Sequence, residues 1–126
     1  MPLVRIDLRA GKSAEYRAAL GDAVHRAMVE TIDVPAADRF QVITEHPAGG
    51  MIHDTSYLGI VRSDDVVFVQ ITLNAGRTVE KKKALYARIA ELVAERPGLR
   101  REDVLVSLVE VSKENWSFGN GVAQYA

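Results

Sequence analysis

The sequence predicts an α+β fold, a two-layer α/β sandwich in which two tandem β-α-β units form a four-stranded sheet with two helices on one face. Three observations predict it. The chain matches itself at an offset of 65 positions, as between Ile6 and Ile71. Each copy opens and closes with an apolar run of strand composition, and a helical apolar pattern lies between the runs. A strand, a crossover helix and a second strand form a right-handed parallel unit, so two units can join edge to edge.

The repeat predicts one domain built from two units. The turn Ala10-Gly11-Lys12-Ser13 matches Ala75-Gly76-Arg77-Thr78, and further matches join Asp38 to Asp103 and Glu45 to Glu110. We expect a single domain over 1–126, with units at about residues 2–46 and 66–111. A linker or short hairpin then occupies 47–65, and a tail occupies 112–126.

Each unit has the same order of elements. We expect first strands at residues 3–8 and 66–73, each followed by a glycine-containing turn that ends in a capping residue, Ser13 or Thr78. Apolar side chains then recur at helical spacing: Tyr16, Leu20, Val24 and Met28 in the first unit, and Leu85, Ile89, Leu92 and Val93 in the second. Pro35 and Pro97 stop the helices. Second strands follow at residues 40–45 and 104–111.

Composition excludes several classes of protein. The apolar fraction of 48% suits a packed core, and the formal net charge of −1 gives no electrostatic case for binding nucleic acid or an anionic membrane. The absence of cysteine excludes disulfides and thiolate metal sites and favours a cytoplasmic location. No signal segment or membrane-spanning stretch is expected.

The predicted sheet leaves one face without a cover from the same chain. Because strand residues such as 66–71 are apolar on both sides, we expect that face to be apolar and to be buried by further copies of the protein in a closed homo-oligomer.

Pro2 is the first candidate for chemistry. If Met1 is removed, the chain starts with a secondary amine, and an α-amino group titrates at about pH 7.7–8.0, where it can act as an acid or a base. An inert N-terminus is the alternative.

Arg77 and Asp38 are the next candidates. Arg77 lies in the turn before the second helix, where a guanidinium and free backbone N–H groups can receive a carboxylate, although a basic residue can simply suit a solvated turn. Asp38 precedes the second strand, and its match with Asp103 leaves a structural turn or cap role open beside catalysis.

The tail supplies aromatic candidates. Trp116 and Phe118 alternate, so in extended backbone they point the same way and can line a substrate site or an oligomer interface. The three histidines, His25, His46 and His53, have no nearby ligand set, so we expect no metal site and no cofactor.

Taken together, these residues resemble the tautomerase superfamily, most of all the branch of malonate semialdehyde decarboxylase and the tautomerase-like proteins with an N-terminal proline. The resemblance covers essentially the whole chain. It is carried by four stretches: Met1-Pro2-Leu3-Val4, Val34-Pro35-Ala36-Ala37-Asp38-Arg39-Phe40-Gln41, Asn74-Ala75-Gly76-Arg77-Thr78 and Asn115-Trp116-Ser117-Phe118-Gly119.

The resemblance implies a tautomerase/MIF-like fold, a homotrimer and removal of Met1. It implies that Pro2 is the acid or base, that Arg77 holds the carboxylate of a small substrate, and that Asp38 assists a proton or water. Trp116 and Phe118 would line the pocket. Some decarboxylases of this branch have two arginines around the turn before the second helix, whereas residues 74–77 supply one.

Three functions follow from these expectations. A neutral Pro2 supports cofactor-independent keto–enol tautomerisation of small 2-oxo acids. A cationic Pro2 with Asp38 supports malonate semialdehyde decarboxylation or a related hydration. A non-catalytic trimeric binding or assembly protein is the third.

Overall fold

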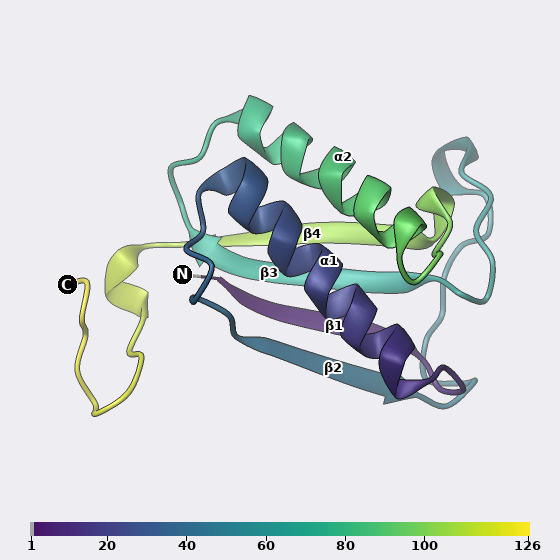
Figure 1. The fold of residues 1–126 in the computed structure, drawn as a ribbon, viewed down its shortest axis with the longest axis horizontal. Coiled ribbons are helices and arrows are strands. Elements are labelled where there is room, and N and C mark those ends of the chain that lie inside the picture. Colours follow the sequence, from purple (N-terminus) through teal and green to yellow (C-terminus); the bar gives the residue numbers. More distant parts are fainter. Residues whose placement is uncertain (1) are drawn as a thin grey trace.

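A computed structural model describes residues 2–126. Its main elements are β1 (Leu3–Arg9), α1 (Ala14–Ile32), β2 (Gln41–His46), β3 (Val67–Asn74), α2 (Val79–Glu95) and β4 (Val104–Val111). Short 3₁₀ turns occupy Tyr57–Gly59, Arg101–Asp103 and Lys113–Asn115. The sheet order is β2-β1-β3-β4, and both helices cover the same face (Figure 1). The predicted α+β fold is confirmed, with β2 starting one residue later than expected and residues 47–65 forming no strand.

The strand pairing joins two parallel units through an antiparallel centre. β1 pairs in parallel with β2, and β3 pairs in parallel with β4. β1 and β3 run antiparallel, and Arg5 lies opposite Gln70, its own counterpart in the repeat. A local twofold axis therefore passes through this pair. It places the end of β1 and the end of β3 at opposite ends of the sheet in equivalent positions.

Individual contacts recur 65 positions apart. The N–H of Ala10 donates to His46 O at 2.8 Å, and that of Ala75 donates to Val111 O at 2.9 Å. The ion pair between Arg17 and Glu45 has its counterpart in Lys82 and Glu110. The hydroxyls of Ser13 and Thr78 cap the two helices by accepting from the N–H three residues on. The two turns are thus built by the same backbone chemistry.

The core lies between the sheet and the helices. Alternation along each strand sends every second side chain toward the helices, where it packs on the apolar stripe of α1 or α2. The largest fully buried side chains are Ile6, Leu8, Leu20, Met28, Ile32, Ile71, Leu73, Leu85 and Ile89. The expected helical stripes are confirmed, except that Tyr16 is only partly buried.

The other face of the sheet carries both apolar and polar side chains, which corrects the expectation of an apolar face. Leu3, Leu105 and Val109 are exposed there, but the central pair Arg5 and Gln70 is exposed as well. The physical reason is the alternation itself, because the side chains that follow Leu3 on this face of β1 are Arg5, Asp7 and Arg9.

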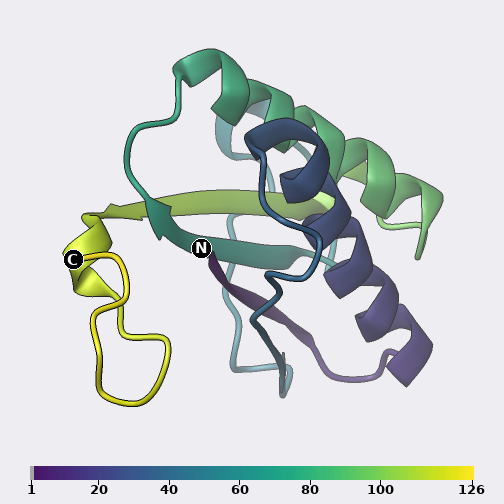
Figure 2. The ribbon, with the colours of Figure 1, turned by 60° about the vertical axis from the view of Figure 1, so that its left-hand side comes forward.

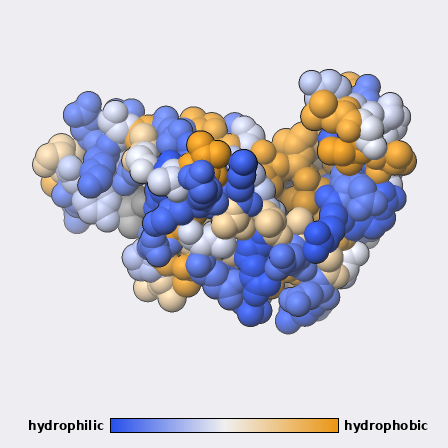
Figure 3. All heavy atoms as spheres, turned by 90° about the horizontal axis from the view of Figure 1, so that it is seen from above, coloured by the Kyte–Doolittle hydropathy of each residue, from blue (hydrophilic) through white to orange (hydrophobic). Residues whose placement is uncertain are grey.

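The linker carries a second exposed apolar group. Its members are Ile52, Tyr57, Leu58 and Val61. Hydrophobic atoms gather on the lobe at the right of Figure 3, the side on which the linker lies in Figure 1.

The C-terminal tail leaves the end of β4 and lies at the same end of the sheet as the start of β1 (Figures 1 and 2). None of the helices within residues 2–126 has the length and apolar character needed to cross a bilayer.

Candidate active site

Pro2 is buried at the start of β1, where it lines a cavity of about 200 Å³. The N–H of Val4 donates to Phe40 O at 3.0 Å, which holds the residue before β2 beside the start of β1. The tail closes the other side. The lining residues are Pro2, Leu3, Phe40, Trp116, Ser117 and Phe118. A largely apolar, partly enclosed space therefore surrounds Pro2.

The aromatic wall is held together by the tail itself. The rings of Trp116 and Phe118 stack with centroids 5.4 Å apart, and Tyr125 packs edge-on against Phe118 at 5.3 Å. Gln124 accepts from the N–H of Phe118 at 2.9 Å and donates to Gly119 O at 3.0 Å. These contacts fold residues 116–125 into a loop that fixes the two rings on the cavity side.

Arg77 stands close to this wall but does not line the cavity. Its guanidinium donates from Nε and Nη2 to Ile32 O, at the end of α1, and from Nη1 to Asn74 O at 3.1 Å. A guanidinium has five N–H groups, and these bonds engage three. One N–H on each terminal nitrogen is left to meet the two oxygens of a carboxylate.

Asn74 connects Arg77 to the cavity. Its backbone oxygen accepts from Arg77, and its side-chain oxygen accepts from Trp116 Nε1 at 2.8 Å. The end of β3 thus couples the cation to the aromatic wall. The sequence pattern could have singled out Asn74, since alternation along β3 sends this last residue to the open face.

Asp38 is buried, with 6% of its surface exposed, two residues before Phe40. Its N–H donates to Pro35 O at 3.0 Å, which forms the turn that leads into β2. The equivalent Asp103 is fully buried, and its carboxylate accepts from the N–H and hydroxyl of Ser63 at 2.7 and 2.6 Å. Asp38 comes two residues before Phe40, whose carbonyl bonds to Val4 of β1, and it is absent from the residues that line the cavity.

The structure thus brings Pro2, Trp116 and Phe118 into one cavity, joins Arg77 to it through Asn74, and buries Asp38 nearby. Phe40, Leu3 and Ser117 line the cavity without having been predicted. The expected removal of Met1 stays a prediction, because Met1 lies outside the residues that the structure describes.

The histidines lie elsewhere. His25 bonds to Ala36 O at 2.8 Å, and His46 to Asp7 at 2.7 Å. No group of three or more potential metal-ligating side chains comes together among residues 2–126.

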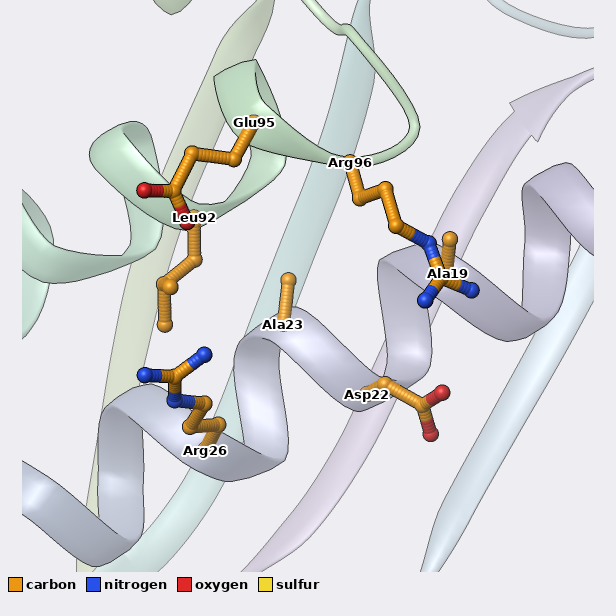
Figure 4. A pocket seen from close by; sticks show the side chains of 7 residues that line it. All are labelled: Ala19, Asp22, Ala23, Arg26, Leu92, Glu95 and Arg96. Atoms are coloured by element: carbon orange, nitrogen blue, oxygen red, sulfur yellow. The ribbon is translucent and has the colours of Figure 1, made fainter.

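A separate groove lies between the two helices. It measures about 220 Å³, and Figure 4 shows Ala23 and Leu92 between the charged groups of Asp22, Arg26, Glu95 and Arg96. Two acidic and two basic side chains line the groove, so their charges balance, and no serine, threonine, cysteine, lysine or histidine side chain is among its lining residues.

Comparison with known proteins identifies the family. Two family models, both described as tautomerase enzyme, match residues 2–59 and 38–119. The probable tautomerase YusQ of Bacillus subtilis (strain 168) is 42% identical over 98% of both chains. A malonate semialdehyde decarboxylase inhibited by 3-bromopropiolate superposes with a TM-score of 0.92, at 43% identity, over 98% of this chain and 93% of its own. A wild-type fused 4-OT, a symmetric trimer, superposes at 0.77 with 28% identity over 95% and 94%.

The chain belongs to the tautomerase family. This confirms the resemblance stated from the sequence and the enzyme class, an isomerase of the tautomerase type.

Proposed function

We propose that this chain is a cofactor-independent tautomerase that interconverts the keto and enol forms of small 2-oxo acids, with the Pro2 amine as general base and acid. One observation carries the proposal. Pro2 is buried in a cavity of substrate size whose wall, Trp116, is hydrogen-bonded to the residue that also holds Arg77.

The cavity suits proton transfer by an amine. Once Met1 is removed, Pro2 has a secondary amine, and an apolar surrounding disfavours its cationic form and so lowers its pKa. A neutral amine removes the proton α to the substrate carbonyl, and the resulting ammonium returns it to the other end of the enolate. Arg77 holds the substrate carboxylate and stabilises the enolate charge.

Asp38 provides the basis for a second function, decarboxylation or hydration. Its buried carboxylate would favour a cationic Pro2, which polarises a carbonyl as an acid while Asp38 assists a water. The similarity to a malonate semialdehyde decarboxylase favours this alternative. The single arginine in the turn from Asn74 to Arg77 favours tautomerisation.

We further propose that the protein works as a homotrimer in the cytoplasm. A solved relative is a symmetric trimer, and the exposed Leu3, Leu105 and Val109 on the open face are suited to burial by other copies. The chain has no cysteine, which suits a reducing compartment.

The assay that tests the function compares two substrates on protein whose intact mass shows that Met1 is absent. We expect rapid ketonisation of the enol of phenylpyruvate, followed by ultraviolet absorbance, and little carbon dioxide release from malonate semialdehyde. Rapid carbon dioxide release from malonate semialdehyde, with slow ketonisation of the phenylpyruvate enol, would establish decarboxylation as the function. Inactivity toward both substrates would favour the non-catalytic assembly protein.

A further inference from the structure

The end of β1 carries a second cavity, at the opposite end of the sheet from Pro2. It measures about 320 Å³, and its lining includes Arg9, Lys12, Tyr16, Asp64, Asp65 and Val67. The repeat makes this cavity the counterpart of the candidate active site. Arg9, Lys12 and Val67 stand where Asn74, Arg77 and Pro2 stand in the other half.

The equivalence extends to contacts. Arg9 Nη2 donates to Met51 O at 3.1 Å, and the residues at the matching positions, Asn74 and Trp116, are also hydrogen-bonded to each other, with Trp116 as the donor. Gly11 and Gly76 open the two turns at φ values of 117° and 120°. At each end of the sheet, therefore, a turn with the same backbone conformation carries a cationic side chain, Lys12 in one half and Arg77 in the other.

Two carboxylates of this chain are bound in the second cavity. Asp64 pairs with Arg9 Nη1 at 2.7 Å, and Asp65 pairs with Lys12 Nζ at 2.8 Å. The hydrogen bond from Lys12 to Asp65 raises the pKa of the lysine, and its ammonium also lies 5.2 Å from the centre of the Tyr16 ring. The turn at the end of β1 is thus a built receptor for carboxylates that the linker fills.

We propose that this cavity is a second anion site, which takes a small dicarboxylate on Arg9 and Lys12, and that Asp64 and Asp65 are its internal competitors. The two cations are anchored, with 22% and 34% of their side chains exposed, whereas the side chains of Asp64 and Asp65 are 86% and 55% exposed. Ion pairs with such exposed partners are weak and open readily. A free dicarboxylate supplies both carboxylates in one molecule.

This second site is expected to bind a dicarboxylate without catalysing a reaction on it. Val67 occupies the position of Pro2 but lies within the chain, where its nitrogen is an amide without basicity. Carboxylates tethered to the same chain act at an effective concentration of about a millimolar, so the free ligand competes at millimolar concentration or above. The inference does not depend on the proposed tautomerase activity, because none of these groups belongs to the Pro2 cavity.

The test is a titration of ¹⁵N-labelled protein with succinate, read from the amide resonances of residues 10–13. In the double variant Asp64→Asn and Asp65→Asn, we expect saturable shifts at these amides, with an affinity about tenfold higher than in the wild type. Adding Lys12→Gln to the double variant should abolish them. A well-dispersed amide spectrum shows that each variant is folded.

A charge-matched control separates site binding from general attraction. Glu91→Gln with Glu95→Gln removes two negative charges from α2 and should leave the wild-type affinity unchanged. Each of the following outcomes contradicts the proposal: no shifts at residues 10–13 in the double variant, the same gain in the control, or shifts that survive Lys12→Gln. Shifts confined to residues 74–78 would report the candidate active site alone and would also contradict it.

Discussion

Trp116 and Asn74 tie the C-terminal tail to the end of β3 by a hydrogen bond of 2.8 Å from the indole nitrogen to the amide oxygen. The backbone oxygen of the same asparagine accepts from Arg77 at 3.1 Å. A single residue thus links the wall of the Pro2 cavity to the guanidinium that we propose as the carboxylate receptor. The positions of the Trp116 ring and of the Arg77 guanidinium are therefore coupled.

Trp116→Phe tests this link. The phenyl ring keeps an aromatic wall but removes the donor, and a lost hydrogen bond of this kind costs about 1 kcal/mol. We expect kcat/KM for phenylpyruvate ketonisation to fall about fivefold, mostly through KM. Tyr86→Phe on α2 is the control, and its steady-state kinetics should match the wild type. Equal kinetics in both variants would show that the link is unimportant.

Arg77→Ala tests the receptor. Removing a hydrogen-bonded cation that faces a carboxylate costs about 2–5 kcal/mol, so we expect kcat/KM to fall about 100-fold. Lys12→Ala removes the equivalent cation from the other half of the molecule and should leave kcat/KM unchanged. The methyl ester of the substrate lacks the charge, so its turnover should be far less sensitive to Arg77→Ala. A similar loss with the ester would mean that the substitution acts through structure, by releasing Ile32 O and Asn74 O.

Gly76→Ala and Gly11→Ala form a matched pair. Both glycines have φ near +120°, which other residues adopt only under strain, and neither has an atom within 4 Å of an added Cβ. We expect each substitution to lower the free energy of unfolding by about 1–3 kcal/mol, measured by urea denaturation. Only Gly76→Ala, beside Arg77, should also raise KM. A rise in KM in both variants would point to a global effect.

Much of this architecture could be predicted because it repeats. The helical spacing of the apolar residues predicted which faces of α1 and α2 are buried. The match of residues 10–13 with residues 75–78 predicted the positions of both turns. What the repeat could not reveal was the asymmetry between the two ends. Asp64 and Asp65 fill one end through ion pairs with Arg9 and Lys12, and such contacts depend on how the linker folds back.

Within the site, Pro2, Trp116 and Phe118 were identified as candidates from the sequence, but Phe40 and Asn74 were not. Phe40 reaches the cavity because β2 pairs with β1 in a particular register, with Val4 bonded to Phe40 O. Sequence spacing does not fix such a register. The prediction of an apolar open face was wrong, because Arg5 and Gln70 meet at the centre of that face.

The ionisation of Glu30 makes the stability of the folded protein depend on pH. Hydrogen bonds from Arg88, and then from Arg26, hold the pKa of the Glu30 carboxyl below its ordinary value of 4.5. A lowered pKa in the folded state means that the stabilisation is complete above pH 4.5 and is lost as the pH falls through the folded value. Thermal unfolding of the wild type between pH 3 and 6 should show this loss. Glu30→Gln should have a lower Tm at pH 6 and a smaller drop toward pH 3, and an unchanged drop would count against the pair.

The most direct test of the account compares the same chain with and without Met1. An amide at Pro2 cannot accept a proton, so retention of the methionine removes the proposed base and leaves every other site residue in the sequence unchanged. The measurement is the ketonisation rate of the phenylpyruvate enol for both forms, separated and checked by intact mass. We predict that the form that retains Met1 is slower by about 100-fold or more. Equal rates would contradict the central claim that the Pro2 amine performs the chemistry.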